Sequence, residues 1–175
     1  MIRSATPADI PAILALIREL AAYEKLTHAC VATEELLTQH LFGSDRAAEA
    51  LVAEITTPVE VPCVIGYAIF FKTFSTFLAR PGFYLEDIYV QPKYRNQGHG
   101  KAMLQHLAQL TLARNYGRLE WTCLDWNTPS LAFYQSIGAD NLKQWQLHRL
   151  TGETLKKFAS PTSPSHRDAN AANPL

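Results

Sequence analysis

Hydrophobic residues in the first quarter of the chain recur at helical spacing after one short strand. The strand-like segment around Ile2 is followed by residues 6–9, Thr-Pro-Ala-Asp. A threonine cap, a proline at the first helical position and an acidic first turn are typical of a helix start. Apolar residues then fall three and four apart between Ile10 and Ala21, which predicts a helix with one buried face. A second start signal at 33–35 precedes a shorter helix that ends near Gly43.

From residue 50 onward the pattern changes to β-branched and aromatic runs separated by polar turns. The elements predicted there are, in order, a strand at 50–55, a loop at 56–62, a strand at 64–74, a turn at 80–82, a strand at 83–90, a helix opened by Gly98 and Gly100, a strand at 119–124, a helix from Thr128 to Gly138, a strand at 145–150 and a short helix at 154–159. This order predicts one mixed α/β domain over residues 1–159. Residues 160–175 are rich in Ser, Pro, Asn and Ala, and we expect a disordered tail there.

Composition and charge exclude several classes of protein. Hydrophobic residues make up 47% of the 175 residues, which is enough to bury a core. Lys plus Arg and Asp plus Glu are both 16, so the basic excess of a nucleic-acid-binding protein is missing. Cys30, Cys63 and Cys123 lack paired spacing, which argues against a disulfide scaffold or a zinc site and favours a cytoplasmic location. We expect no metal, no signal peptide and no membrane span, because no apolar run approaches about 20 residues.

The segment from Tyr84 to Gly100 carries the first chemical signal: a strand, a short polar loop and two glycines that open a helix. Backbone N–H groups at a helix N-terminus bind phosphate oxygens, because they point outward with a partial positive charge behind them. Gly98 and Gly100 lack Cβ atoms and let a pyrophosphate approach the backbone. Arg95 and Lys101 add positive charge nearby. The segment therefore predicts a phosphate-binding loop.

Two nucleotide-binding patterns fail in this segment and a third is complete. A Walker A loop requires a glycine where Arg95 stands and a Ser or Thr where Ala102 stands. A Rossmann fingerprint requires a third small residue where Met103 stands. The pattern [Q/R]-x-x-G-x-[G/A] is filled by Arg95, Gly98 and Gly100. Taken alone, this third pattern is equally compatible with a surface turn that contains two glycines.

A second motif follows the next predicted strand. It reads W-N-T-P-S-L-A-F-Y over residues 126–134, with Gly-Ala at 138–139. Together with the phosphate loop it resembles the GCN5-related N-acetyltransferase (GNAT) superfamily. Within that superfamily the sequence is most similar to the diamine (spermidine/spermine) and thialysine acetyltransferase group, and the resemblance extends from Ile2 to about Phe158. The strings that carry the closer likeness are residues 3–6 (RSAT), 19–24 (ELAAYE), 84–87 (YLED) and 126–127 (WN).

The resemblance implies an α/β fold, the GNAT fold, with a central mixed, mostly antiparallel sheet flanked by helices. Acetyl-CoA would lie in a V-shaped splay between the two strands that end near Val90 and Leu124. The strand backbone would hold the pantetheine arm, the loop would hold the pyrophosphate, and the second motif would contact the cofactor from the other side. The residues implied are Ile88, Tyr89 and Val90 on the strand, Arg95, Asn96, Gln97, Gly98, His99, Gly100 and Lys101 in the loop, and Asn127, Thr128, Pro129 and Ser130 in the second motif.

The resemblance also implies two catalytic residues. Tyr134 would be the general acid for the leaving thiolate of coenzyme A, a role that suits a phenol with a pKa near 10. An alkyl ammonium must lose a proton before it attacks, and Glu86 would accept that proton through water. Glu86 and Asp87 are adjacent, so on a regular strand only one of them faces the site unless a bulge intervenes. Each has a structural alternative: Tyr134 as a core aromatic beside Phe133, and Glu86 as a hydrogen-bonded strand carboxylate.

A small-molecule amine is the implied acceptor. The residues expected to contact it are Tyr23, Glu24, Glu86, Glu120, Trp121 and Thr122. Polyamine enzymes use further acidic positions, which are Thr76, Leu78 and Gln146 in this sequence. None of these three is acidic, so a diamine or an amino acid-like amine such as thialysine is favoured over a long polycation.

The resemblance further implies a homodimer, and we expect neither a nucleic acid nor a membrane as partner. Two alternatives stay open at this point. One is a GNAT enzyme that acts on a protein N-terminus or lysine. The other is a non-catalytic acetyl-CoA-binding module, which would need neither Tyr134 nor Glu86.

Overall fold

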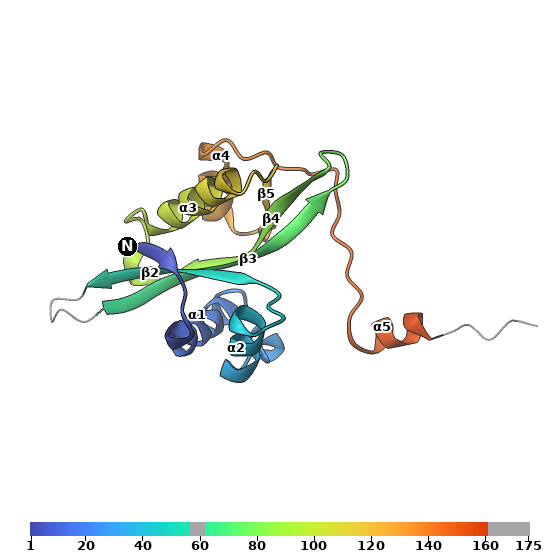
Figure 1. Ribbon diagram of the computed structural model, residues 1–175, viewed down its shortest axis with the longest axis horizontal. Helices are drawn as coiled ribbons and strands as arrows, with labels where there is room; N and C mark the ends of the chain where they lie inside the picture. The colour runs from blue at the N-terminus through green and yellow to red at the C-terminus, as the bar shows by residue number, and fades with distance from the viewer. Residues whose placement is uncertain (57–61, 161–175) are drawn as a thin grey trace, which may run out of the picture. The chain divides into compact units, whose positions relative to one another are not determined.

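The computed structural model describes residues 1–56 and 62–160 (Figure 1). The chain divides into two compact units, Met1–Leu124 and a second unit that begins at Asp125. The predicted tail at 160–175, apart from Ser160, and most of the predicted loop at 56–62 lie outside the described residues.

The first unit is built on a five-stranded sheet in which the strands follow their order in the sequence. All neighbours are antiparallel except the last pair, which is parallel. The strands are β1 (Ile2–Ser4), β2 (Glu49–Thr56), β3 (Pro62–Ser75), β4 (Arg80–Val90) and β5 (Leu119–Trp121). This is the mixed, mostly antiparallel sheet that the sequence predicted.

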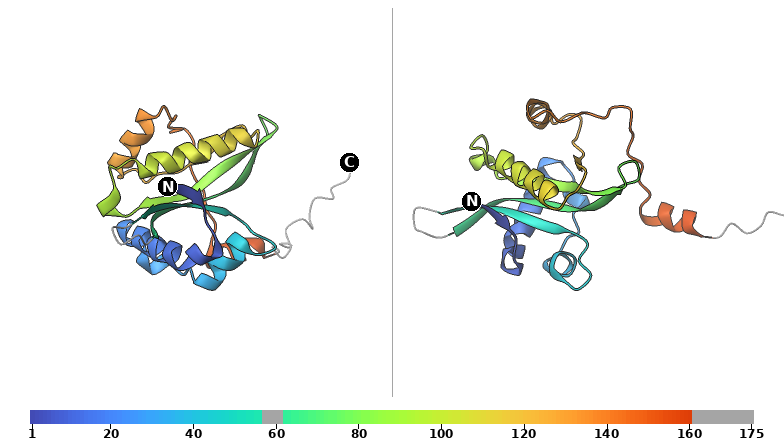
Figure 2. Two further views of the ribbon diagram at one scale, coloured as in Figure 1. Left: turned by 60° about the vertical axis from the view of Figure 1, so that its left-hand side comes forward. Right: turned by 45° about the horizontal axis from the view of Figure 1, so that its top comes forward.

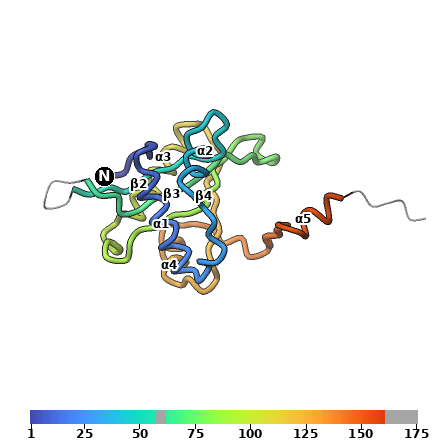
Figure 3. The backbone as a smooth tube through the Cα atoms, turned by 90° about the horizontal axis from the view of Figure 1, so that it is seen from below, coloured from blue at the N-terminus to red at the C-terminus, as the bar shows by residue number. Residues whose placement is uncertain are grey.

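Helices cover both faces of this sheet (Figure 2). Helices α1 (Ile10–Tyr23) and α2 (Glu34–Phe42) lie on one face, and α3 (His99–Ala113) lies on the other. Figure 3, seen from the side of α1 and α2, shows α1 running across β3 and β4. Three short 3-10 turns, η1 (Pro7–Asp9), η2 (Thr27–Ala29) and η3 (Pro92–Tyr94), join these elements.

The helix boundaries follow the predicted start and stop signals. The Thr33 hydroxyl accepts a hydrogen bond from the Leu36 N–H at 3.3 Å and caps α2. At the first start signal, the Asp9 carboxylate accepts from the Thr6 N–H at 2.7 Å and from the Thr6 hydroxyl at 2.9 Å. The polar residues of each signal therefore satisfy backbone groups at the place where the chain turns into a helix.

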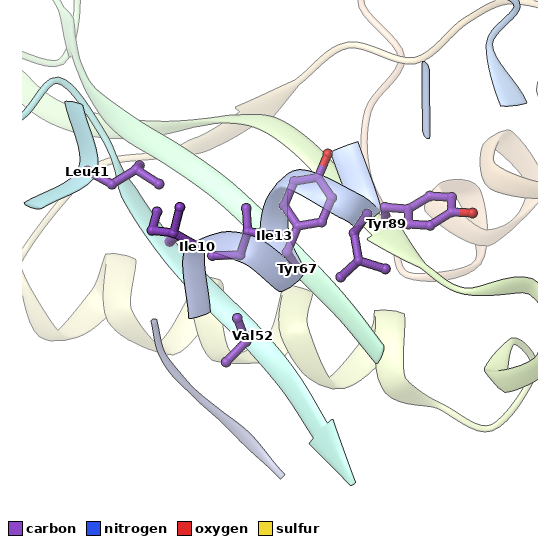
Figure 4. Close-up of a cluster of buried hydrophobic side chains, with 8 residues drawn as sticks. Ile10, Ile13, Leu41, Val52, Tyr67 and Tyr89 are labelled. Atoms are coloured by element: carbon purple, nitrogen blue, oxygen red, sulfur yellow. The ribbon is translucent and has the colours of Figure 1, made fainter. Parts of the chain in front are cut away.

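A buried cluster fills the space between the sheet and the helices α1 and α2 (Figure 4). Ile13 of α1, Val52 of β2 and Tyr67 of β3 have no exposed surface. The alternation of the strands and the helical spacing of α1 bring these apolar side chains to one interface. The cluster fixes α1 against the middle of the sheet, so the C-terminal turn of α1 is held at the end of β4.

One predicted turn is wrong. Pro81 and Gly82 belong to β4, where they pair with Phe74 and Thr73 of β3. The chain instead reverses just before them, where Ala79 adopts a positive φ of 47°. Pro-Gly is a frequent turn pair, but here the Pro81 carbonyl accepts from the Gly117 N–H at 2.8 Å, so this position has a strand-like role at the sheet edge.

The second unit contains helices α4 (Thr128–Ser136) and α5 (Gly152–Ala159). Gly138 follows α4 with a φ of 81°, so the predicted helix stop is confirmed. The predicted strand at 145–150 is wrong: these residues form no regular element, and Trp145 and Leu147 are 72% and 71% exposed. A strand needs a hydrogen-bonded partner, and the described part of this unit holds no other strand.

The described residues contain neither a metal-binding cluster nor a membrane-spanning helix. Within residues 1–56 and 62–160, no group of three or more His, Cys, Asp or Glu side chains is arranged to hold a metal ion. No helix in the same residues is long and apolar enough to cross a membrane.

Candidate active site

A bulge in β4 shapes the centre of the candidate site. Ile69 of β3 pairs with Asp87, whereas the next residue of β3, Phe70, pairs with Leu85. Glu86 is therefore an extra residue in β4 without a counterpart on β3. A bulge interrupts the regular alternation of side chains and re-aims them. The rule that only one of two neighbouring carboxylates faces the site does not apply at this position.

The edge of β4 beyond this bulge is open on the side of β5. The parallel pairing runs from Phe83 with Leu119 to Leu85 with Trp121, and β5 ends there. It is shorter than the predicted 119–124 strand. Residues 87–90 therefore pair with β3 on one side only among the described strands. An open strand edge can hydrogen-bond an extended ligand backbone, which is the role expected of Ile88, Tyr89 and Val90.

The predicted phosphate loop leads from β4 to α3 as expected. Gly98 caps α3 with a φ of 86°, a conformation that favours glycine, and Asn96 has a φ of 60°. A Cβ atom added at Gly98 or at Gly100 would meet nothing within 4 Å. The space above both glycines is therefore free of protein atoms, and the first-turn N–H groups of α3 border it. All seven predicted loop residues, Arg95 to Lys101, lie in this connection or in the first turn of α3.

The Arg95 side chain is engaged by the protein itself. Its Nε donates to the Val90 carbonyl at 2.9 Å. Its guanidinium carbon lies 5.1 Å from the centre of the Tyr23 ring and 5.3 Å from that of Tyr89. Arg95 thus connects the phosphate loop with the end of α1, where the predicted acceptor residues Tyr23 and Glu24 lie.

Three carboxylates interact near the bulge. Burial raises the pKa of Asp87 to about 6, with smaller contributions from the negative charges of Glu86 and Glu24. Burial also raises the pKa of Glu24. The Tyr67 hydroxyl donates to the Asp87 carboxylate at 3.4 Å. The structure therefore places Glu24 and Glu86 each close enough to Asp87 to raise its pKa. The sequence favoured Glu86 over Asp87, because neighbouring side chains of a regular strand face opposite sides, and the bulge that changes this is visible only in the structure.

The predicted acceptor residues in β5 and directly after it have partners within the first unit. Glu120 forms an ion pair with Arg118, with a distance of 2.7 Å from Oε2 to Nε. The Tyr84 hydroxyl and the Thr122 hydroxyl are 3.2 Å apart. Trp121 is half-buried and pairs with Leu85 in the sheet. The charge of Glu120 is balanced by its neighbour, so Glu24, Glu86 and Asp87 are the stronger candidates for binding a cation.

In the second unit, the predicted cofactor motif forms the start of α4. The Asn127 side-chain oxygen accepts from the Ser130 N–H at 3.4 Å and caps the helix, with Thr128 and Pro129 in its first turn. Tyr134 lies half-buried on α4, with its ring 5.5 Å from that of Phe133. Both residues of the aromatic pair are half-buried, so burial does not separate a core role from a catalytic role for Tyr134.

Comparison with known proteins assigns these features to a family. Residues 16–139 match the model of the acetyltransferase (GNAT) family. The chain belongs to the GNAT family. GNAT acetyltransferases use acetyl-CoA, and this chain is an acetyl-CoA-dependent N-acetyltransferase.

Relatives of this GNAT chain include enzymes named for small amines. It is 40% identical over 165 residues to thialysine N-epsilon-acetyltransferase from Bos taurus, which covers 91% of this chain and 96% of the relative. It is 35% identical over 195 residues to L-ornithine N5-acetyltransferase NATA1 from Arabidopsis thaliana, which covers 89% and 86% of the two chains. Among solved structures, an integron cassette protein of V. cholerae has a TM-score of 0.73 at 23% identity, covering 92% of this chain and 98% of that one. This last likeness concerns the fold alone.

The GNAT loop of this chain suits the pyrophosphate of acetyl-CoA. The space next to Gly98 and Gly100 holds no protein atoms within 4 Å of a Cβ position, and a side chain at either residue would occupy it. Packing therefore does not explain the two glycines, whereas access for a ligand does. Helix N-terminal N–H groups supply the donors and Lys101 is exposed beside them. The residues present therefore fit the group that the family uses.

Proposed function

We propose that this GNAT enzyme acetylates a primary amine of a small molecule, a diamine or an amino acid-like amine such as thialysine or ornithine. The observation that carries this proposal is the group of interacting carboxylates Glu24, Glu86 and Asp87 beside the open edge of β4. Carboxylates at this position attract an ammonium group and hold it next to the place proposed for the donor. The names of the thialysine and ornithine relatives support the same class of acceptor.

In the proposed reaction, acetyl-CoA supplies an activated thioester. The residues of this chain accept a proton from the amine and donate a proton to the leaving sulfur. Asp87 and Glu24 orient the acceptor ammonium, and Glu86 accepts one of its protons through water. The neutral nitrogen then bonds to the acetyl carbon as the carbon–sulfur bond breaks. Tyr134 donates its phenolic proton to the departing sulfur and is reprotonated by the second proton, which the acylated nitrogen loses, while the Glu86 proton passes to solvent. We propose that Ile88, Tyr89 and Val90, the loop 95–101 and the turn 127–130 hold the donor.

A short acceptor is favoured over a long polyamine. Thr76 and Leu78 lie in the turn between β3 and β4, and Gln146 lies in the second unit. None of these side chains is acidic, so none adds a carboxylate for a second or third ammonium group. Leu78 is 50% exposed. We therefore propose a diamine or an amino acid-like acceptor, with a protein N-terminus or lysine as the second candidate.

We also propose a cytoplasmic homodimer. The three cysteines of the chain are free, which supports a reducing compartment. Large apolar side chains of the second unit, such as Trp145 and Phe158, are 72% and 77% exposed. Exposed apolar groups of this size support an interaction surface.

A coenzyme A-release assay with a panel of amines tests the proposed reaction. The panel contains thialysine, ornithine, lysine, putrescine, spermidine and short peptides with a free N-terminus. Turnover of thialysine, ornithine or putrescine is expected. Turnover of the peptides alone would replace the proposal with a protein acceptor, and no turnover despite acetyl-CoA binding would replace it with a binding module.

A further inference from the structure

We infer that Arg95 is a positioning residue that fixes the acceptor-side end of α1 against the phosphate loop, rather than a direct counter-ion of the phosphates. This inference rests on the proposed function of the two segments that Arg95 connects. The motif that contains Arg95 suggests a cation for the pyrophosphate. The contacts of its side chain point instead to a link within the protein.

The first observation is the position of the guanidinium group. Arg95 Nε donates to the Val90 carbonyl at 2.9 Å, so the side chain folds back over the loop toward the end of β4. Its guanidinium carbon then lies over two aromatic rings, at 5.1 Å from the centre of Tyr23 and 5.3 Å from that of Tyr89. A cation at these distances is attracted by the negative face of each ring. Tyr23 belongs to α1 and Tyr89 to β4, so one side chain contacts both elements.

The second observation is an independent link between the same elements. Glu19 of α1 accepts from the Tyr89 hydroxyl at 3.2 Å and from the Gln91 side-chain amide at 2.8 Å. Glu19 and Tyr23 are four residues apart and lie on one face of the helix. Tyr89 is 6% exposed, so this network is largely shielded from water. The last turn of α1 therefore contacts β4 before Val90, at Tyr89, and the loop after Val90, at Gln91 and Arg95.

The function of this link follows from what lies at its two ends. Glu24, which follows α1, interacts with Asp87 at the proposed acceptor site. The loop after Val90 leads into the proposed phosphate site. Arg95 therefore sets the position of the acceptor carboxylate with respect to the donor loop, and its loss should impair acceptor use even when the donor has no pyrophosphate.

Steady-state kinetics with two donors test this role. With acetyl-CoA and with S-acetylpantetheine, which lacks the pyrophosphate, Arg95→Ala is expected to raise the KM for the amine at least fivefold. Arg95→Lys should be impaired to a similar extent, because a lysine keeps the charge but loses the Nε bond and the planar group. A defect confined to acetyl-CoA and relieved by Arg95→Lys would overturn the inference in favour of a phosphate counter-ion.

Hydrogen exchange of the protein without ligands tests the same link independently of catalysis. In Arg95→Ala, amide protons of residues 19–26 should exchange at least threefold faster than in the wild type. Lys93→Ala is the matched control, because Lys93 also lies over a ring, that of Tyr94 at 4.8 Å, within the same loop. Unchanged exchange at 19–26 in Arg95→Ala, or an equal increase in Lys93→Ala, would overturn the inference. An absence of turnover in the wild type would instead count against the proposed function.

Discussion

Glu86 and Asp87 are neighbours on β4 with different surroundings. Glu86 is exposed at the bulge, whereas Asp87 is partly buried and accepts a hydrogen bond from Tyr67. The pKa of Asp87 is raised to about 6, chiefly by burial. A carboxylate with a raised pKa in a site is a candidate for function. These differences separate the expected effects of replacing each residue.

Replacing Asp87 with asparagine is expected to stabilise the fold at pH 7 and to weaken acceptor binding. The pKa of Asp87 rises from 3.8 to about 6 on folding, so the folded state binds the proton more tightly. The stabilisation from this proton is complete below about pH 4 and is lost as the pH rises through about 6. At pH 7 the ionised group costs up to about 3 kcal/mol, which Asp87→Asn removes.

Urea unfolding at pH 7 and pH 4, together with the KM for the amine, checks this prediction. The gain in the free energy of unfolding should be present at pH 7 and absent at pH 4, and the KM should rise. A variant that is less stable than the wild type at pH 7 would contradict the assigned surroundings of Asp87.

Replacing Glu86 with glutamine is expected to affect the pH dependence of turnover. Without the proton acceptor, the amine must lose its proton to water, so kcat/KM should fall at least tenfold at pH 7 and the pH–rate profile should move to higher pH. Asp87→Asn is the matched control, since it removes the neighbouring carboxylate and leaves Glu86 in place. Profiles of the same shape in the wild type and in Glu86→Gln would remove Glu86 from its proposed role.

Replacing Tyr134 with phenylalanine separates the proton donor from the aromatic packing. The ring next to Phe133 is kept, so the fold and the affinity for acetyl-CoA should match the wild type. The phenolic proton is lost, and kcat should fall at least tenfold. Stopped-flow binding and steady-state kinetics give the two quantities. An unchanged kcat would return Tyr134 to a structural role.

At the scale of elements, the two glycines at the start of α3 have different reasons: Gly98 is needed for its backbone conformation, and Gly100 is explained by the proposed ligand. Gly98 has a φ of 86°, whereas Gly100 lies within α3. A Cβ atom at either position would meet no protein atom within 4 Å, so neither glycine is required by packing. Gly100→Ala should therefore raise the free energy of unfolding by about 0.5–1 kcal/mol, because alanine is the better helix residue. It should also lower the affinity for acetyl-CoA, because the added methyl group enters the proposed phosphate space.

Gly98→Ala is the comparison variant for this prediction. It should lose stability as well as affinity, because alanine is strained at that φ. Thermal unfolding and calorimetric titration with acetyl-CoA check both variants. Normal acetyl-CoA affinity in Gly100→Ala would count against a pyrophosphate at this helix end.

The elements also show what the sequence can and cannot predict. Periodicity located α1 and α2, because their apolar faces are buried against the sheet. The Pro81–Gly82 pair and the segment 145–150 led to wrong predictions, because local turn and strand preferences are overridden by the presence or absence of a pairing strand. The bulge at Glu86 and the contacts of Arg95 were not predictable, because both depend on how distant segments pair.

At the scale of the whole molecule, the numbers of positive and negative residues are equal, but the charges are not evenly distributed. Lys plus Arg and Asp plus Glu are both 16, yet acidic groups gather at the bulge and cations lie beside the phosphate loop. The neutral total fits an enzyme whose ligands meet a few placed groups rather than a charged surface. The family could be recognised from its two motifs, whereas the proposed choice of acceptor rests on Asp87 and Glu24, whose surroundings only the structure describes.

The central claim is acetyl transfer to a short amine held by Glu24, Glu86 and Asp87. The most direct test is a competition in which thialysine, ornithine, putrescine and spermidine are offered to the enzyme together at equal concentration, with mass spectrometry of the acetylated products over time. The account predicts that thialysine, ornithine or putrescine is acetylated first and that spermidine lags. Preferential acetylation of spermidine, or no acetylated amine at all, would contradict it.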